Sequence, residues 1–179
     1  MRKLVFILLL VVSATLIESW EKYDGNPVLS PDYPWCFYAL GDPDLIAIPG
    51  GGFYLVYTAA GLDSVHGTVL TRPGAAWSSN GFDWTMSSGP VLTNGDSGTW
   101  DSAAVETPAV VFDNDSIILV YVGDWAHGAW QEMGLGIASS HDGGASFSRL
   151  VDGPVLENDT TRTEELYWIE SPTIIRIGD

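Results

Sequence analysis

Three carboxylate side chains stand just before prolines at corresponding places along the chain. Asp42 directly precedes Pro43, whereas Glu106 and Glu170 each lie two residues before a proline. When carboxylates lie close together, each raises the proton affinity of its neighbours, so one can stay protonated near neutral pH while another is ionised. Such a set is suited to general acid and general base chemistry.

The segments that carry these acids belong to an internal repeat. NPVLSP begins at Asn26 and returns as GPVLTN at Gly89 and as GPVLEN at Gly153. Each copy is followed by a proline-led apolar stretch: GDPDLIAIPGGGFYLVYTA, ETPAVVFDNDSIILVYVG and ESPTIIRIGD. In the first two, apolar runs flank a turn rich in Gly, Asn or Asp, which predicts an antiparallel hairpin.

Each unit continues with a third strand, a turn and a short fourth strand, in AAWSSNGFDWTM and GIASSHDGGASFSRL. Aligning the two places Trp84 opposite Phe147, so we expect one aromatic ring per unit between neighbouring sheets. A repeated four-stranded antiparallel unit predicts an all-β β-propeller, with a β-sandwich as the alternative. In a propeller the first strand of every unit lines a central channel, which would bring the three acids together.

The composition and the N-terminal residues indicate which partners the protein can bind and where it is located. The 179 residues include 23 Asp and Glu but only 7 Lys and Arg, a formal net charge of −16. This charge disfavours nucleic acid and anionic membranes as partners. Arg2 and Lys3, then LVFILLLVV and SAT, predict a signal peptide over residues 1–19 and a secreted or periplasmic protein, not membrane-bound after cleavage. One cysteine, Cys36, permits no internal disulfide, so the core must hold the fold.

The motifs GDPDLI, FYLVYTA and ESPTII resemble those of five-bladed propeller glycoside hydrolases, family 43 and its relatives in families 32, 62, 117 and 130. The resemblance covers the chain from Trp20 and implies an enzyme that cleaves glycosidic bonds in plant or microbial glycans. It also implies Asp42 as the general base and Glu170 as the general acid. In the inverting form of this chemistry, the base activates a water molecule while the acid protonates the leaving oxygen.

The middle unit departs from the family pattern. There the family has Asp directly before the proline position, modulating the acid and holding substrate, and this chain has Thr107 with Glu106 one residue earlier. In a regular strand a shift of one residue reverses the facing of a side chain. Glu106 is therefore the first candidate for the modulating acid, and Asp101 replaces it if Glu106 points away.

Other side chains are candidates for binding sugar. Trp100 and Trp168 lie just before the acid positions, and His127 follows the second hairpin, where it could reach the channel. Asp101 could also contact the substrate. No metal-ligand spacing is present, and no cofactor is required. The family resemblance implies a possible calcium ion in the channel, with ligands partly from units beyond this chain.

The stretch SHDGGASF fits the Asp-box pattern of sialidases and other propellers, where it locks a turn between outer strands. We interpret it as structural. A sialidase needs an arginine cluster for the substrate carboxylate, and none of the arginines after the signal peptide lies at an inner-strand start. The alternatives to a family 43-like glycoside hydrolase are a non-catalytic carbohydrate-binding propeller and a sialidase-like Asp-box propeller.

The repeat also predicts the extent of the domain. Residues 20–179 would hold about two and a half blades of a propeller truncated at its C-terminus. Two blades and one strand leave apolar sheet faces uncovered, so we expect residues 20–179 alone to aggregate or oligomerise and to lack glycosidase activity. The sequence does not distinguish the sugar, the linkage, or hydrolysis from phosphorolysis.

Overall fold

The computed structural model describes residues 20–65, 67–125, 133–159, 161 and 169–177. The predicted signal peptide, residues 1–19, lies outside them. The described chain is all-β apart from one short 3-10 helix, η1 (Pro34–Cys36). No helix among the described residues is both long enough and apolar enough to span a membrane.

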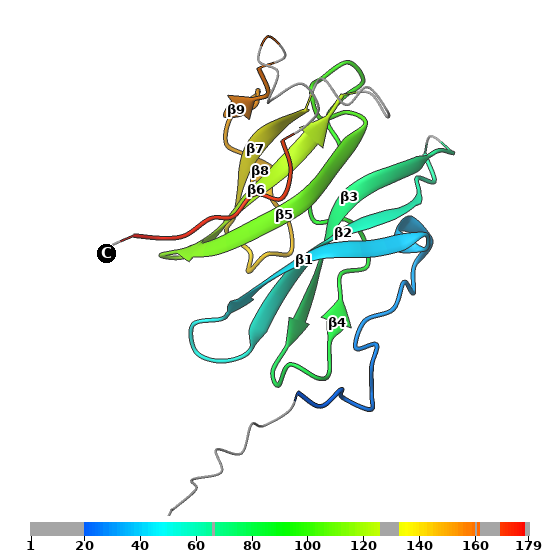
Figure 1. Cartoon of the computed structure of the whole chain (residues 1–179), viewed down its shortest axis with the longest axis vertical. Coiled ribbons are helices and arrows are strands. Elements are labelled where there is room, and N and C mark those ends of the chain that lie inside the picture. Colours follow the sequence, from blue (N-terminus) through cyan, green and yellow to red (C-terminus); the bar gives the residue numbers. More distant parts are fainter. Residues whose placement is uncertain (1–19, 66, 126–132, 160, 162–168, 178–179) are drawn as a thin grey trace, which may run out of the picture.

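Two antiparallel four-stranded units make up the fold (Figure 1). The first contains β1 (Ala39–Ala47), β2 (Phe53–Leu62), β3 (Val69–Ser78) and β4 (Thr85–Met86). The second contains β5 (Ala104–Asp113), β6 (Ser116–Asp124), β7 (Met133–Ser140) and β8 (Ser148–Arg149), and β9 (Leu156–Glu157) also pairs with β7. One parallel pairing, Thr71 with Ala104, links the units. The predicted hairpins and four-stranded units are confirmed.

The hairpin turns form where the sequence places Gly and Asn. Gly50, Gly51 and Gly52 all have positive φ between β1 and β2, a region open to glycine without steric cost. Asn114 takes φ 53° between β5 and β6, and Asn tolerates this region better than most residues. These turns set the register of both hairpins, which begins with Ala47 opposite Phe53 and Asp113 opposite Ser116.

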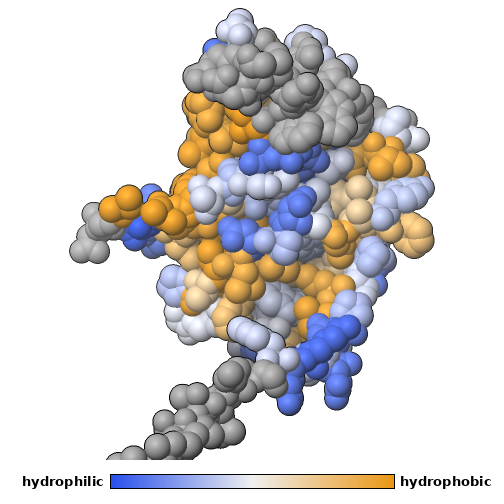
Figure 2. All heavy atoms as spheres, viewed as in Figure 1, coloured by the Kyte–Doolittle hydropathy of each residue, from blue (hydrophilic) through white to orange (hydrophobic). Residues whose placement is uncertain are grey.

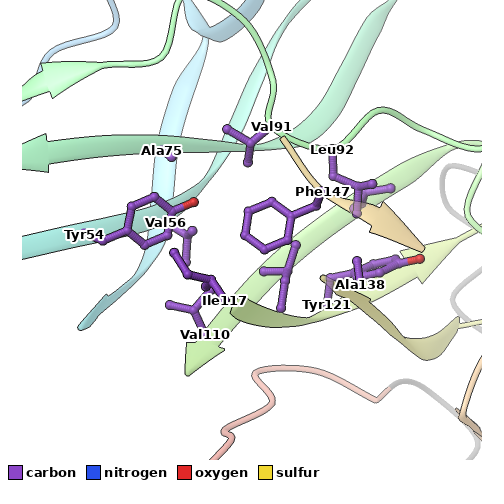
Figure 3. Close-up of a cluster of buried hydrophobic side chains, with 12 residues drawn as sticks. Tyr54, Val56, Ala75, Val91, Leu92, Val110, Ile117, Tyr121, Ala138 and Phe147 are labelled. Atoms are coloured by element: carbon purple, nitrogen blue, oxygen red, sulfur yellow. The ribbon is translucent and has the colours of Figure 1, made fainter. Parts of the chain in front are cut away.

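The main hydrophobic core lies between the two units (Figure 3). Phe147 from the second unit packs with Tyr54 and Val56 from β2 and with Val91 from the connecting segment. The backbone N–H of Phe147 also donates to the carbonyl of Val91 at 2.8 Å. The predicted position of Phe147 between sheets is therefore confirmed.

Trp84 belongs to a different cluster. It packs against Trp35, Cys36 and Tyr57, beside η1, and its indole N–H donates to the Gly81 carbonyl at 2.9 Å. Trp84 therefore packs on the side of the first unit that carries η1, and not between the two described units. The N-terminal segment carrying η1 provides its packing surface.

The Asp-box stretch forms the tight turn between β7 and β8. Asp142 accepts hydrogen bonds from the backbone and the hydroxyl of Ser146, at 3.0 and 2.6 Å, and these hydrogen bonds lower its pKa to about 2. The turn also holds the first unit, because the Tyr54 hydroxyl donates to the Gly144 carbonyl at 2.9 Å. A structural role for this stretch follows from these contacts.

Residues 169–177 run beside β5 in the same direction (Figure 1). Arg176 lies 3.4 Å from the carboxylate of Asp113 and donates to the Asn114 side chain at 3.3 Å, at the far end of β5. Figure 2 shows this segment as a largely hydrophobic arm at the left of the view, and Ile175 and Ile177 are exposed.

Candidate active site

The same backbone feature occurs three times, at the prolines of β1, β5 and the segment 169–177. The residue before proline has positive φ in every case: 47° at Asp42, 45° at Thr107 and 52° at Ser171. In β1 and β5 the strand pairing shifts at this place, between Gly41 and Asp44 and between Glu106 and Ala109. Since proline lacks an N–H for the ladder, a bulge here costs little pairing.

The three proline segments meet around one cavity of about 240 Å³. Its walls come from three stretches: Asp42 to Asp44, Thr107 to Ala109, and Ser171 to Thr173. Two hydrogen bonds connect β5 to the first unit at this place. The N–H of Thr107 donates to the Thr58 hydroxyl at 2.8 Å, and the N–H of Val110 donates to the Asp44 carboxylate at 2.8 Å. The three proline segments therefore lie side by side, as the repeat predicted.

The carboxylates at these segments influence one another. Burial raises the pKa of the half-buried Glu106, and the charges of Glu170, Asp124 and Asp42 raise it further, in that order. Asp42 and Glu170 themselves are exposed. Asp42, Glu106, Asp124 and Glu170 thus form one electrostatic set, the carboxylate group, at one end of the first strands.

Asp124 is the member of the carboxylate group that the repeat does not predict. It is the last residue of β6 and pairs with Ala104, while Glu106 pairs with Val122. Residues two apart on a strand share a face, and directly paired residues share it too, so Asp124 and Glu106 lie on one face of the hairpin. The predicted hairpin did contain a signal for Asp124. In an antiparallel hairpin the last residue of the second strand lies beside the first residue of the first strand, near Glu106.

The acids do not occupy equivalent positions in the repeat. The shared positive φ makes Asp42 equivalent to Thr107 and Ser171, which leaves Gly41 equivalent to Glu106 and Glu170. Asp42 is therefore one position out of step with the glutamates. The concern that this displacement turns Glu106 away does not hold, because the bulge interrupts the regular alternation.

Asp101 lies in a different environment. Its side chain is buried, and Oδ2 accepts from Nε of Arg149 at 2.7 Å and from the Tyr121 hydroxyl at 3.1 Å. The second guanidinium nitrogen, Nη2, lies 2.6 Å from the same oxygen. Asp101 is not among the residues that shift the pKa of Glu106. This placement gives Asp101 a structural ion pair rather than the role of a spare modulating acid.

Of the other predicted sugar-binding residues, only Trp100 lies within the described part of the chain. Trp100 stacks on Tyr121, with ring centroids 5.7 Å apart and planes 20° apart. It also lines a cavity of about 310 Å³ together with Trp125 and Glu157. Trp168 and His127 lie outside the described residues.

The possible calcium ion finds no ligand set in the described part of the chain. Among those residues, no group of three or more His, Cys, Asp or Glu side chains is arranged to hold a metal ion.

Comparisons with known proteins place this fold among glycoside hydrolases. No family model matches the chain. A 1,2-beta-oligomannan phosphorylase from Thermoanaerobacter sp. (strain X514) is 36% identical over 96 residues, which are 51% of this chain and 31% of the phosphorylase. A solved glycoside hydrolase matches 73% of this chain and 38% of its own, with 17% identity and a TM-score of 0.59.

A family 117 glycoside hydrolase from the marine bacterium Zobellia galactanivorans matches with 22% identity and a TM-score of 0.56. The match covers 71% of this chain and 35% of that enzyme. The chain thus spans about a third of the length of these relatives. The likeness establishes an all-β fold shared with part of these glycoside hydrolases, but not membership of family 43.

Proposed function

We propose that this protein is a secreted or periplasmic glycoside hydrolase of the five-bladed propeller type. Its substrate would be an oligo- or polysaccharide of plant or microbial origin. The observation that carries the proposal is the carboxylate group, in which Glu106, Glu170, Asp124 and Asp42 lie close enough for the charges of the other three to raise the pKa of Glu106. The fold shared with glycoside hydrolases supports it.

In the proposed mechanism Asp42 is the general base and Glu170 the general acid, acting with inversion. Asp42 would take a proton from water as that water attacks the anomeric carbon, and Glu170 would protonate the leaving oxygen. Glu106 would act through its neighbours, because its ionised form raises the proton affinity of any carboxyl nearby.

The raised pKa of Glu106 favours a second assignment, in which Glu106 itself is the proton donor. A general acid must hold its proton near the working pH, and burial together with like charges provides this. The two assignments share the same carboxylate group and the same base, so substitutions at positions 106 and 170 separate them.

The test compares Glu170→Gln, Glu106→Gln and a control, Glu21→Gln, whose side chain is exposed on the N-terminal segment. Each variant is made in a longer protein that includes the rest of the proposed propeller, because residues 20–179 alone are expected to be inactive. It is assayed on an unactivated glycan and on an aryl glycoside with a good leaving group. Loss of the acid should slow glycan cleavage by about 10²–10⁴-fold and aryl glycoside cleavage far less. The residue showing this split is the donor, and a wild-type protein that binds glycans but releases no sugar would refute the enzyme proposal.

The oligomannan phosphorylase likeness makes phosphorolysis a second candidate reaction. Here inorganic phosphate would replace water as the attacking group, and the product would be a sugar 1-phosphate. Product analysis by NMR with and without phosphate distinguishes the two reactions. The same spectra give the configuration of the first-formed anomer, and retention would contradict the inverting mechanism.

A further inference from the structure

Two large aromatic side chains, Phe37 and Tyr38, are exposed to solvent directly before β1. Each residue is 65% exposed. Their ring centroids lie 5.9 Å apart with the ring planes at 80°, so one ring can lie flat against a ligand while the other borders it. A single exposed ring needs no explanation, but adjoining exposed apolar side chains commonly mark a binding surface.

The second unit shows that the fold does not need aromatic side chains at this place. β1 and β5 each begin four residues before their proline. The two residues before β5 are Ser102 and Ala103, which therefore correspond to Phe37 and Tyr38. Because small side chains serve in one unit, the two exposed rings of the other have a role other than folding.

The ring pair lies at the same end of the first unit as the proposed base. The N–H of Tyr38 donates to the Ala60 carbonyl at 2.9 Å, which continues the pairing of β1 with β2. β5 runs in the same direction as β1 (Figure 1), so Glu106 also lies near the start of its strand. Tyr38 precedes Asp42 by four residues, which separates their Cα atoms by at most about 14 Å. A short oligosaccharide bound at the carboxylate group can span this distance.

The chemistry around the rings fits a neutral sugar. Both rings line a cavity of about 320 Å³ together with Asp32, Tyr33 and Leu62. Asp32 is exposed, so its carboxylate can accept hydrogen bonds from sugar hydroxyl groups while an aromatic ring covers the apolar face of the sugar. Among the described residues no Lys or Arg lines this cavity. The negative charge of Asp32 therefore disfavours a sugar that carries a carboxylate.

We propose that Phe37 and Tyr38 form an aromatic platform that binds a neutral sugar residue of the substrate, away from the bond that is cleaved. This inference rests on the proposed glycan-cleaving function. It narrows the substrate class to neutral oligosaccharides that extend beyond the two residues joined by the cleaved bond. The competing occupant is another part of a longer protein, which would cover the rings as protein core does.

The test measures binding in the longer protein that is used for the activity assays. The reference protein carries Asp42→Asn, which removes the proposed base so that no ligand is consumed. Cellotetraose, mannotetraose and xylotetraose are the neutral probes and tetragalacturonic acid is the acidic probe, each titrated by calorimetry. The platform variant adds Phe37→Ser together with Tyr38→Ala, the residue types of the second unit. The control adds Phe82→Ser instead, because 53% of Phe82 is exposed beyond β3, at the other end of the first unit.

At least one neutral tetrasaccharide should bind the reference protein, and the platform variant should bind it at least about tenfold more weakly. The control should stay within about twofold of the reference, since its substitution lies far from the platform. Tetragalacturonic acid should bind more weakly than the best neutral probe. The melting temperature of the platform variant should stay within about 2 °C of the reference, because both rings are exposed.

Unchanged binding by the platform variant, no binding of any neutral probe, or tightest binding of the acidic probe would overturn the proposal. A fall in melting temperature with unchanged binding would assign the rings to an interface within the longer protein and also overturn it. Cleavage of glycans by a protein whose platform variant binds normally would leave the proposed function intact. Conversely, platform-dependent binding by a protein that releases no sugar would support the platform and refute the enzyme.

Discussion

Replacing Asp101 by Asn tests whether this acid is structural or functional. The change removes the charge opposite Arg149 and can place an amide donor where Oδ2 now accepts from Nε of Arg149 and from the Tyr121 hydroxyl. Breaking a buried ion pair from one side costs about 3–5 kcal/mol. Because the Arg149 side chain is 24% exposed and can be partly hydrated, we expect the lower end, about 3 kcal/mol.

For a protein of this size, about 3 kcal/mol corresponds to a fall in melting temperature of about 6–12 °C. Differential scanning calorimetry of wild type, Asp101→Asn, Arg149→Met and the double variant measures it. The double variant should lose less stability than the two single losses combined, because each single change leaves an unmatched partner.

Activity, or glycan binding, should be unchanged well below the melting temperature, since Asp101 does not contribute to the raised pKa of Glu106. A melting temperature within about 2 °C of wild type, less than about 1 kcal/mol, together with lost activity, would refute this reasoning. It would restore Asp101 as a member of the catalytic machinery.

Three further predictions concern single groups. The raised pKa of Glu106 means that its carboxyl holds a proton more tightly in the folded state than in the unfolded state. Glu106 therefore lowers the stability of the folded state as pH rises above 4.5, the ordinary pKa of this carboxyl. Glu106→Gln should therefore melt higher than wild type at neutral pH but not below pH 4.5, as pH-dependent melting curves would show. Asp142 has the opposite sign, since its pKa is lowered to about 2. Asp142→Asn should melt lower than wild type at neutral pH, and the difference should vanish as pH falls through about 2. Tyr54→Phe leaves the Gly144 carbonyl without its buried donor and should cost about 1–3 kcal/mol in denaturant unfolding, with no change in sugar binding.

Local signals made much of the fold predictable. The Gly-rich and Asn-containing turns and the alternation of apolar residues specify the hairpins from neighbouring residues alone. The Asp-box turn is equally local, because Asp142 bonds to Ser146 four residues away. Phe147 could be placed because the repeat supplied its counterpart in the other unit.

Longer-range features were not predictable in this way. The partner of Asp101 is 48 residues away, and nothing in the repeat pairs an aspartate before β5 with an arginine in β8. Asp124 lies in the carboxylate group because of how β5 and β6 pair. The sequence predicts this hairpin but defines its register only approximately. Trp84 differs from Phe147 because a non-repeated segment, η1, covers its side of the first unit.

The positive-φ turn before each of the three prolines explains how one backbone conformation carries three different pairs of side chains. The pairs Gly41–Asp42, Glu106–Thr107 and Glu170–Ser171 occupy the same two positions before proline, with positive φ at the second. Thr107 adopts φ 45° although β-branched residues disfavour this region, so packing and its bond to Thr58, not its own preference, impose the turn. Because the turn does not depend on the side chain, an acid can stand at either position without changing the fold. Asp42 at one position and the two glutamates at the other therefore belong to one carboxylate group. In the proposed mechanism, this difference in position separates the base from the candidate acids.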